Sequence, residues 1–225
     1  MLRVAAESGT TDLVATPHAN LTYRFDPKLI RERLAELAAK SPVRLYSGCD
    51  FHLSYDNIQD AIENPHKYTI NQKCYLLVEF SDLLIFRNTA EIFGRLQDAG
   101  MVPVITHPER NGLLRQRIEN LQSWIEAGAR VQITAQSLTG RFGSRAREFS
   151  AALLDRGLVH FVASDAHDCE NRPPRLDEAH ALLAKRYGES AANLLCVENP
   201  KAAIEGGPVL RLPATEPKKW YQLWR

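Results

Sequence analysis

The sequence predicts an α/β fold in which parallel strands alternate with helices along almost the whole chain. One pattern recurs: a helical stretch ends in glycine, and an apolar strand that closes on a polar residue follows, as after Gly9, Gly100, Gly128 and Gly157. The strands are apolar at nearly every position, which is typical of a parallel sheet covered on both faces. Because the alternation is unbroken, it favours a barrel over an open sheet.

The elements can be placed in order along the chain. Six strands are predicted, at residues 12–18, 44–51, 74–80, 102–107, 130–136 and 159–167. The first helix after a strand begins at Asp26, a favoured N-cap residue, with Pro27 in its first turn. Apolar residues at helical spacing mark one face of each helix: Leu29, Ile30, Leu34 and Leu37; Ile92, Phe93 and Leu96; Ile118, Leu121 and Ile125; Phe149, Leu153 and Leu154; and Leu176, Ala179, Leu183 and Tyr187.

The domain organisation predicted from these elements is one barrel domain over residues 1–208 and a C-terminal tail over 209–225. A closed parallel barrel has about seven or eight strands, so six strands are too few. The chain opens on the end of a helical pattern at residues 1–9. We therefore expect the first strand of the barrel to be missing.

Composition excludes several classes of protein. The 28 Lys and Arg residues nearly balance 27 Asp and Glu residues, and a formal net charge of +1 does not suit a general nucleic-acid binder. No apolar run has the length of a transmembrane helix, and residues 1–9 do not resemble a signal peptide. The four cysteines are scattered without zinc-type spacing. These features predict a reduced, cytoplasmic protein.

The ends of the predicted strands carry the candidate chemistry. In a parallel barrel the active site lies where the strands end. The residues at these ends are His18, Asp50, Glu79, His107, Asp165 and His167. Nitrogen and oxygen ligands without thiolate suit zinc, manganese or iron, and six groups exceed one tetrahedral site. The pattern therefore predicts two or more metal ions, an arrangement typical of enzymes that hydrolyse phosphate esters.

Two arginines follow predicted strands, Arg110 in THPER and Arg172 in ENRPP. Arginine is suited to binding an anionic phosphate, and an ordinary surface ion pair is the alternative. The other histidines are expected to be structural: His52, His66, His160 and His180. Of these, only His52 shares a strand face with a candidate ligand, Asp50.

Several motifs together resemble one family. ATPH (15–18), GCDF (48–51), LVEF (77–80), ITHPER (105–110) and SDAH (164–167) with NRPP (171–174) occur in the order found in the CpsB/YwqE-like metal-dependent protein-tyrosine phosphatases, members of the polymerase-and-histidinol-phosphatase (PHP) superfamily. The resemblance runs from residue 1 to about residue 208. It implies a distorted (β/α) barrel with seven strands and up to three bound metal ions, commonly Mn2+. It also implies dephosphorylation of tyrosine on the tail of a bacterial tyrosine kinase that governs capsular or exopolysaccharide synthesis.

The resemblance also implies a role for each residue. His18 and His167 match ligands of one ion, Glu79 and His107 match ligands of a second, and Asp165 matches a ligand of a third. Asp50 stands where the family has a Glu that bridges two ions. Arg110 and Arg172 match the phosphate-binding arginines.

The sequence departs from the family pattern in two places. Asp50 in place of Glu is the smaller departure, and the larger one lies at the start of the chain. The H-x-H motif of the family's first strand and the acid that follows it have no match, since the chain begins about thirty residues late by that pattern. We therefore expect fewer bound ions, reduced activity and self-association through exposed strand edges, including a homo-oligomer. Two alternatives stay open: a non-catalytic module that binds a kinase tail or assembly partner, and a small-molecule phosphatase of the histidinol-phosphatase type.

The C-terminal tail contains a group of aromatic and basic residues. Its aromatic and basic residues could form a docking element for a membrane surface or a partner, or pack back onto the body of the protein. They are Lys218, Lys219, Trp220, Tyr221, Leu223 and Trp224.

Overall fold

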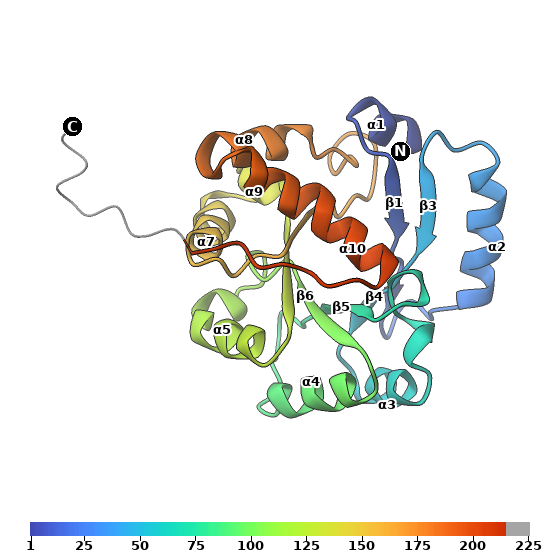
Figure 1. Cartoon of the computed structure of the whole chain (residues 1–225). Coiled ribbons are helices and arrows are strands. Elements are labelled where there is room, and N and C mark those ends of the chain that lie inside the picture. The colour runs from blue at the N-terminus through green and yellow to red at the C-terminus, as the bar shows by residue number, and fades with distance from the viewer. Residues whose placement is uncertain (215–225) are drawn as a thin grey trace.

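All strand pairs in the described part of the chain are parallel, as the apolar strands predicted. The computed structural model describes residues 1–214, and Figure 1 shows helices arranged around the outside of the strands. Strands β1 (Asp12–Ala15) and β3 (Arg44–Ser47) form a two-stranded sheet. A six-stranded sheet has the order β2 (His18–Ala19), β4 (Asp50–His52), β5 (Tyr75–Glu79), β6 (Val102–Thr106), β7 (Arg130–Thr134) and β8 (Phe161–Ala163).

The prediction of six strands was wrong in number, because two of the predicted strands are each divided. Strand 12–18 breaks before Pro17, which has no backbone N–H to donate to a ladder. Strand 44–51 breaks at Gly48, where an added Cβ would lie 2.9 Å from Cγ1 of Val14. Glycine therefore allows the two bent strands to approach each other closely. Within residues 1–214 neither sheet closes on itself, and β2 and β8 are the two ends of the larger one.

Helices connect most successive strands, with β1–β2 and β3–β4 as the exceptions, and Figure 1 shows α10 crossing one side of the molecule. The α-helices are α1 (Leu2–Glu7), α2 (Pro27–Ala38), α3 (Tyr55–Glu63), α4 (Thr89–Asp98), α5 (Ile118–Glu126), α6 (Ala135–Leu138), α7 (Ser144–Asp155), α8 (Asp177–Tyr187), α9 (Glu189–Asn193) and α10 (Asn199–Glu205). Short helical turns are η1 (Pro65–Lys67), η2 (Ile70–Gln72), η3 (Leu114–Gln116) and η4 (Leu194–Glu198). No helix within residues 1–214 combines the length and the apolar character needed to cross a membrane.

The main core lies between the larger sheet and its helices. The predicted apolar faces of α4, α5 and α7 are buried there, and Phe80 stacks on Trp124 with ring centroids 5.6 Å apart. Helix α2 is different, because none of its residues is buried and Leu29 and Leu37 are 48% and 50% exposed. The reason is that α2 packs beside β3 of the small sheet, which offers no buried residue of its own.

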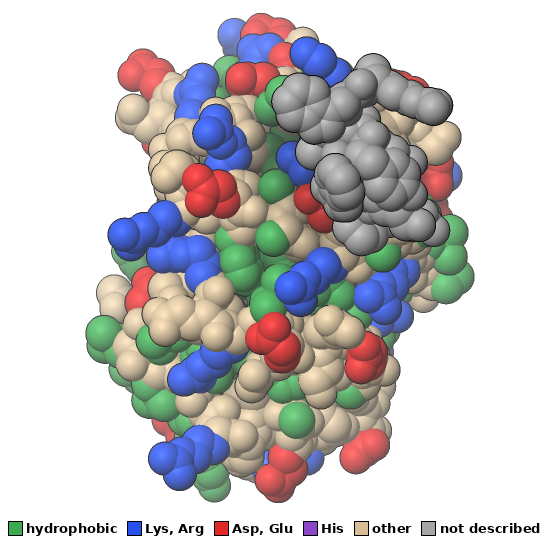
Figure 2. All heavy atoms as spheres, turned by 90° about the vertical axis from the view of Figure 1, so that its left-hand side faces the viewer, with side chains coloured by type: hydrophobic (Ala, Val, Ile, Leu, Met, Phe, Trp, Pro, Cys, Tyr) green, Lys and Arg blue, Asp and Glu red, His purple; other side chains and the backbone are tan. Residues whose placement is uncertain are grey.

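The face of the molecule in Figure 2 has mixed charge, and part of the C-terminal segment is buried. On the face in Figure 2, basic and acidic side chains are interspersed, which fits the balanced composition. Val209 and Leu212 are buried against the body of the protein. The aromatic and basic element predicted at 218–224 lies outside the described residues. All four cysteines are free thiols.

Candidate metal centre

The register of the larger sheet brings candidate ligands from neighbouring strands side by side. His18 on β2 lies opposite Asp50 on β4, and His52 on β4 lies opposite Glu79 on β5. Asp50 and His52 are two residues apart on an extended strand, so their side chains share a face. The parallel pairing therefore places two imidazoles and two carboxylates on one side of three adjacent strands.

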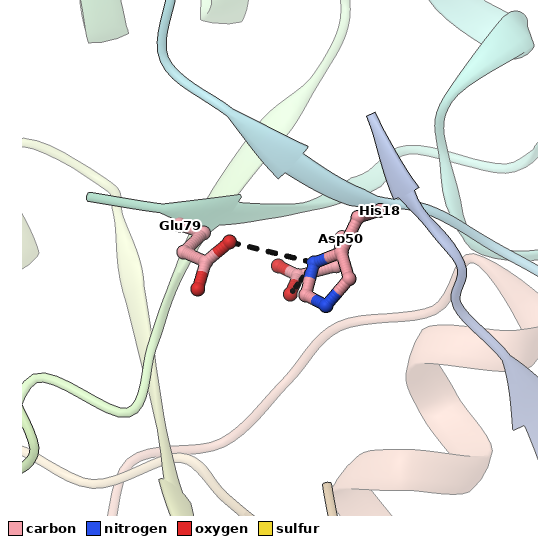
Figure 3. Close-up of side chains that lie close together, drawn as sticks. All are labelled: His18, Asp50 and Glu79. Carbon is pink, nitrogen blue, oxygen red and sulfur yellow. Dashed lines mark ion pairs between the residues drawn. The ribbon is translucent and has the colours of Figure 1, made fainter. Parts of the chain in front are cut away.

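Three of these side chains form a compact cluster, shown in Figure 3. Nδ1 of His18 lies 3.0 Å from Oδ2 of Asp50 and 3.5 Å from Oε2 of Glu79. One ligand atom from each residue lies within 4.8 Å of the other two. An imidazole nitrogen between two carboxylates is a donor set that a divalent cation of the zinc or manganese type accepts.

Two buried polar atoms of this cluster are unsatisfied within residues 1–214. Nδ1 of His18 and Oδ1 of Asp50 are buried, and neither has a hydrogen-bond partner among the described residues. The approach of His18 to Asp50 is close, but it does not have the geometry of a hydrogen bond. Buried polar atoms are normally satisfied, and a cation between these side chains would satisfy both atoms.

The cluster extends along the strand ends through His107. Its Nε2 lies 3.6 Å from Oε1 of Glu79, so Glu79 stands between His18 and His107. His107 and Asp165 both have left-handed backbone conformations, with φ of 35° and 47°. Residues other than glycine adopt this conformation at a cost, and it is concentrated at functional sites. His107 comes directly after β6, and Asp165 comes shortly after β8.

Asp165 joins the cluster to the two predicted phosphate-binding residues. Its Oδ2 accepts hydrogen bonds from the guanidinium groups of both Arg110 and Arg172. Arg172 also donates to the backbone oxygen of Asp165 at 3.0 Å. The ring of His167 lies 6.0 Å from that of His18, and its Nδ1 is 3.8 Å from Oδ1 of Asp165. All eight predicted site residues are thus brought to one end of the sheet.

Neighbouring imidazoles and carboxylates shift the pKa values of His18 and Glu79. The nearby Asp50 carboxylate raises the pKa of His18, although partial burial opposes the shift. For Glu79, burial favours the neutral acid, but the neighbouring imidazoles outweigh it and lower the pKa of the carboxyl group. Glu79 is therefore a carboxylate near neutral pH, as a metal ligand has to be.

Three further residues support the site, and the sequence pointed to only one of them. His52, expected to be structural, has its Nδ1 3.9 Å from Oε2 of Glu79. Its position two residues from Asp50 was the available signal. The ring of Phe142 faces both arginines, with its centroid 4.4 Å from Cζ of Arg110 and 5.7 Å from Cζ of Arg172. No sequence pattern marks it.

The third supporting residue is Glu109, which is completely buried. Its Oε1 accepts hydrogen bonds from the backbone N–H of Thr134, at 2.9 Å, and from Oγ of Ser137, at 2.6 Å. Burial raises the pKa of this carboxyl group. Glu109 thereby fastens the loop that carries His107 and Arg110 to the end of β7. Its neighbours are distant in sequence, so no local signal could identify it.

The other histidines lie apart from the centre. His66 lines a separate pocket of about 400 Å³ beside α2 and η1. His160 is buried, and its Nδ1 accepts a hydrogen bond from the N–H of Val131 at 3.2 Å. Nε2 of His180 lies 2.9 Å from Oδ1 of Asn193.

Comparison with known proteins places the chain among relatives that it matches over nearly their full length. The chain is 35% identical to CapC of Staphylococcus aureus over 99% of this chain and 90% of CapC. It is 32% identical to the tyrosine-protein phosphatase YwqE of Bacillus subtilis over 97% of this chain and 88% of YwqE. The chain also resembles a solved structure from a study of YwqE of Bacillus subtilis and CpsB of Streptococcus pneumoniae, which are described there as metal-dependent tyrosine phosphatases. The two structures superpose with a TM-score of 0.87 and are 32% identical in sequence, over 97% of this chain and 90% of that chain.

A family model gives the same result. The model for capsular polysaccharide synthesis proteins CpsB/CapC matches residues 1–205, which include every candidate ligand and both arginines. The resemblance stated from the sequence motifs is confirmed, and this chain belongs to the CpsB/CapC family.

Proposed function

We propose that this protein is a metal-dependent phosphoester hydrolase that removes phosphate from tyrosine in capsular or exopolysaccharide synthesis. The observation that carries the proposal is the His18–Asp50–Glu79 cluster, with its unsatisfied buried atoms, beside an aspartate that binds two arginines. Relatives that match most of the chain are tyrosine-protein phosphatases, which supports the reaction class.

The proposed metal ligands are His18, Asp50, Glu79, His107, Asp165 and His167. Mn2+ is the metal that we propose, because the resemblance to the family implies it and because carboxylates and imidazoles without thiolate are donors that it accepts. When bound, such ions lower the pKa of water so that hydroxide is available near neutral pH. Asp50, at 7% exposure, and Glu79 supply negative charge at a partly enclosed position where a cation is held strongly.

Arg110 and Arg172 bind the phosphate oxygens of the substrate in this proposal. Their guanidinium groups converge on one oxygen of Asp165, which holds the two groups side by side, and the N–H donors that do not bind Asp165 are the ones proposed for phosphate. Phe142 lies against both groups and limits their movement. As charge develops on phosphorus-bound oxygens, these pre-oriented donors stabilise it. A tyrosine leaving group with a pKa of about 10 needs little help from a general acid.

The proposed substrate is a phosphotyrosine protein, the tail of a bacterial tyrosine kinase, in the cytoplasm. The family match to capsular polysaccharide synthesis supports this setting. The site is open enough for a side chain that projects from a protein, because His18 and His167 keep 32% and 42% of their side chains exposed.

The test is hydrolysis of a phosphotyrosine peptide before chelation, after chelation and after addition of Mn2+. We expect activity to disappear with chelator and to return with Mn2+. His107→Ala should remain inactive after metal addition, whereas the matched control His66→Ala should behave as wild type, because His66 lies outside the centre. Hydrolysis of histidinol phosphate in preference to the peptide would contradict the proposed substrate, and full activity in chelator would contradict the proposed metal dependence.

A further inference from the structure

A basic groove adjoins the candidate metal centre on the side of Arg110. It has a volume of about 500 Å³, and its lining includes Arg110, Arg115, Phe142 and Arg145. Arg110 belongs to both places, since its guanidinium binds Asp165 and lies 4.4 Å from the ring of Phe142. The groove is therefore continuous with the position proposed for the substrate phosphate.

The two segments that form the groove are strongly cationic. Residues 110–117 (RNGLLRQR) and 140–147 (GRFGSRAR) contain six arginines, three in each, and no Asp or Glu. This concentration contrasts with the whole chain, whose net charge is +1. Three of the six, Arg110, Arg115 and Arg145, line the groove. Positive charge gathered there attracts an anionic group and repels a cationic one.

Two of the three lining arginines, Arg115 and Arg145, have no carboxylate partner within residues 1–214. Arg115 donates to the backbone oxygens of Glu109 and Arg110, at 3.0 and 2.9 Å, and these neutral partners do not compensate its charge. Arg145 is exposed, and it forms no hydrogen bond or ion pair with any side chain in residues 1–214. Unpaired arginine at the wall of a groove is suited to carboxylate or phosphate, which it binds with two parallel hydrogen bonds.

The beginning of helix α7 adds to the same wall. Gly143 and Ser144 line the groove, and α7 starts there without a side-chain cap. The first N–H groups of a helix lack partners within the helix, and the helix dipole is positive at this end. The helix end thus adds to the attraction that the arginines exert on an anion.

We propose that this groove is a second anion subsite, which binds an acidic or phosphorylated residue near the target phosphotyrosine in the same peptide. The proposal rests on the proposed function and adds a substrate preference to it. An extended peptide advances about 3.3–3.6 Å per residue, so a group two or three residues from the phosphotyrosine is in reach of the groove when the phosphotyrosine is held by Arg110. Arg145 is the residue specific to this subsite.

The test compares three phosphotyrosine peptides that differ only at positions two and three residues away: neutral, glutamate-containing and carrying a second phosphate. Wild type should have a kcat/KM about tenfold higher for the anionic peptides than for the neutral one. Arg145→Glu should reduce this ratio to about one or less. The matched control Arg156→Glu, at the other end of α7, should keep the wild-type ratio. The glutamate and phosphate arms show which anion the groove prefers.

Binding of the same peptides, with a non-hydrolysable phosphonate in place of the phosphotyrosine phosphate, separates this proposal from the proposed function. If the wild type hydrolyses none of the peptides, the proposed function fails, while tighter binding of the anionic phosphonates that is lost in Arg145→Glu still supports the subsite. Equal binding and equal kcat/KM for neutral and anionic peptides in the wild type would overturn the subsite. An equal loss in Arg156→Glu would also overturn it, because the effect would then be one of overall charge.

Discussion

His52 lies directly opposite Glu79 in the parallel pairing of β4 and β5, with its Nδ1 3.9 Å from Oε2 of Glu79. Glu79 is also approached by His18 and His107, so His52 is the third imidazole near this carboxylate. A residue that orients a metal ligand in this way contributes to metal affinity without being one of the proposed ligands.

The first prediction follows from this pair. His52→Ala should weaken Mn2+ binding and lower kcat by roughly 10–100-fold, the usual effect of removing a residue that orients a ligand. Calorimetric titration with Mn2+ and a turnover assay measure both quantities. His66→Ala removes an exposed imidazole outside the centre and should change neither. Normal Mn2+ affinity in His52→Ala would show that Glu79 is oriented without His52.

The second prediction concerns the number of ions. His18, Asp50 and Glu79 form a compact ligand set, whereas the charge of Asp165 is compensated by two arginines. We expect metal-depleted protein to bind one Mn2+ tightly and any further ion more weakly. Metal analysis after gel filtration gives the stoichiometry, and Asp50→Ala should abolish the tight site. Three tightly bound ions per chain would contradict this prediction.

The third prediction separates phosphate binding from metal binding. Arg172→Ala should raise KM for a phosphotyrosine peptide about tenfold and leave Mn2+ affinity unchanged, because its proposed partner is phosphate. Arg172→Lys keeps the charge but not the paired donors, so its KM should be intermediate. Steady-state kinetics combined with Mn2+ titration test the assignment. Loss of Mn2+ from Arg172→Ala would instead assign Arg172 a role in holding Asp165.

The fourth prediction concerns Glu109. Glu109→Ala leaves the Thr134 N–H and the Ser137 hydroxyl unsatisfied in the interior, which should lower the free energy of unfolding by about 2–4 kcal/mol. Glu109→Gln retains an acceptor oxygen and should cost less. Urea unfolding gives both values, with the exposed Glu119→Ala on α5 as the control. A loss below about 0.5 kcal/mol in Glu109→Ala would place it among ordinary surface changes.

The fifth prediction is a pH dependence of stability. Burial, with the positive charges of Arg130 and Arg211, lowers the pKa of His160 to about 3. The unfolded chain has a histidine pKa of about 6.5, so between pH 6.5 and 3 it binds a proton that the folded chain does not. His160 therefore causes stability to fall as the pH drops below about 6.5, by up to about 1.4 kcal/mol per pH unit.

Denaturant unfolding at pH 7, 6, 5 and 4 measures this slope. His160→Gln removes the titrating group and should give a shallower dependence, whatever its stability at pH 7. His66→Gln, an exposed histidine, should keep the wild-type slope. Identical slopes for wild type and His160→Gln would mean that His160 is not the group responsible.

The sequence by itself determined the parallel α/β class, the helix faces in the main core and the residues at the strand ends. These features depend on local patterns: alternation of apolar strands and helices, glycine after a helix, and a polar residue at the end of each strand. Because the carboxyl ends of parallel strands meet at one edge, the list of strand-end residues was enough to name the candidate ligands that the sheet brings together.

Only the tertiary structure decided which side chains become neighbours. The break of one predicted strand at Gly48 depends on how closely that strand approaches Val14, whereas the break at Pro17 has a local cause in the missing N–H of proline. The partnership of His52 with Glu79 follows from the register of β4 on β5, which no property of either segment reveals. The burial of Glu109 against the end of β7, and the position of Phe142 under the arginines, join segments that lie far apart in sequence. Contacts of this kind arise from hydrogen bonding and packing between elements, and a linear pattern of residues contains neither.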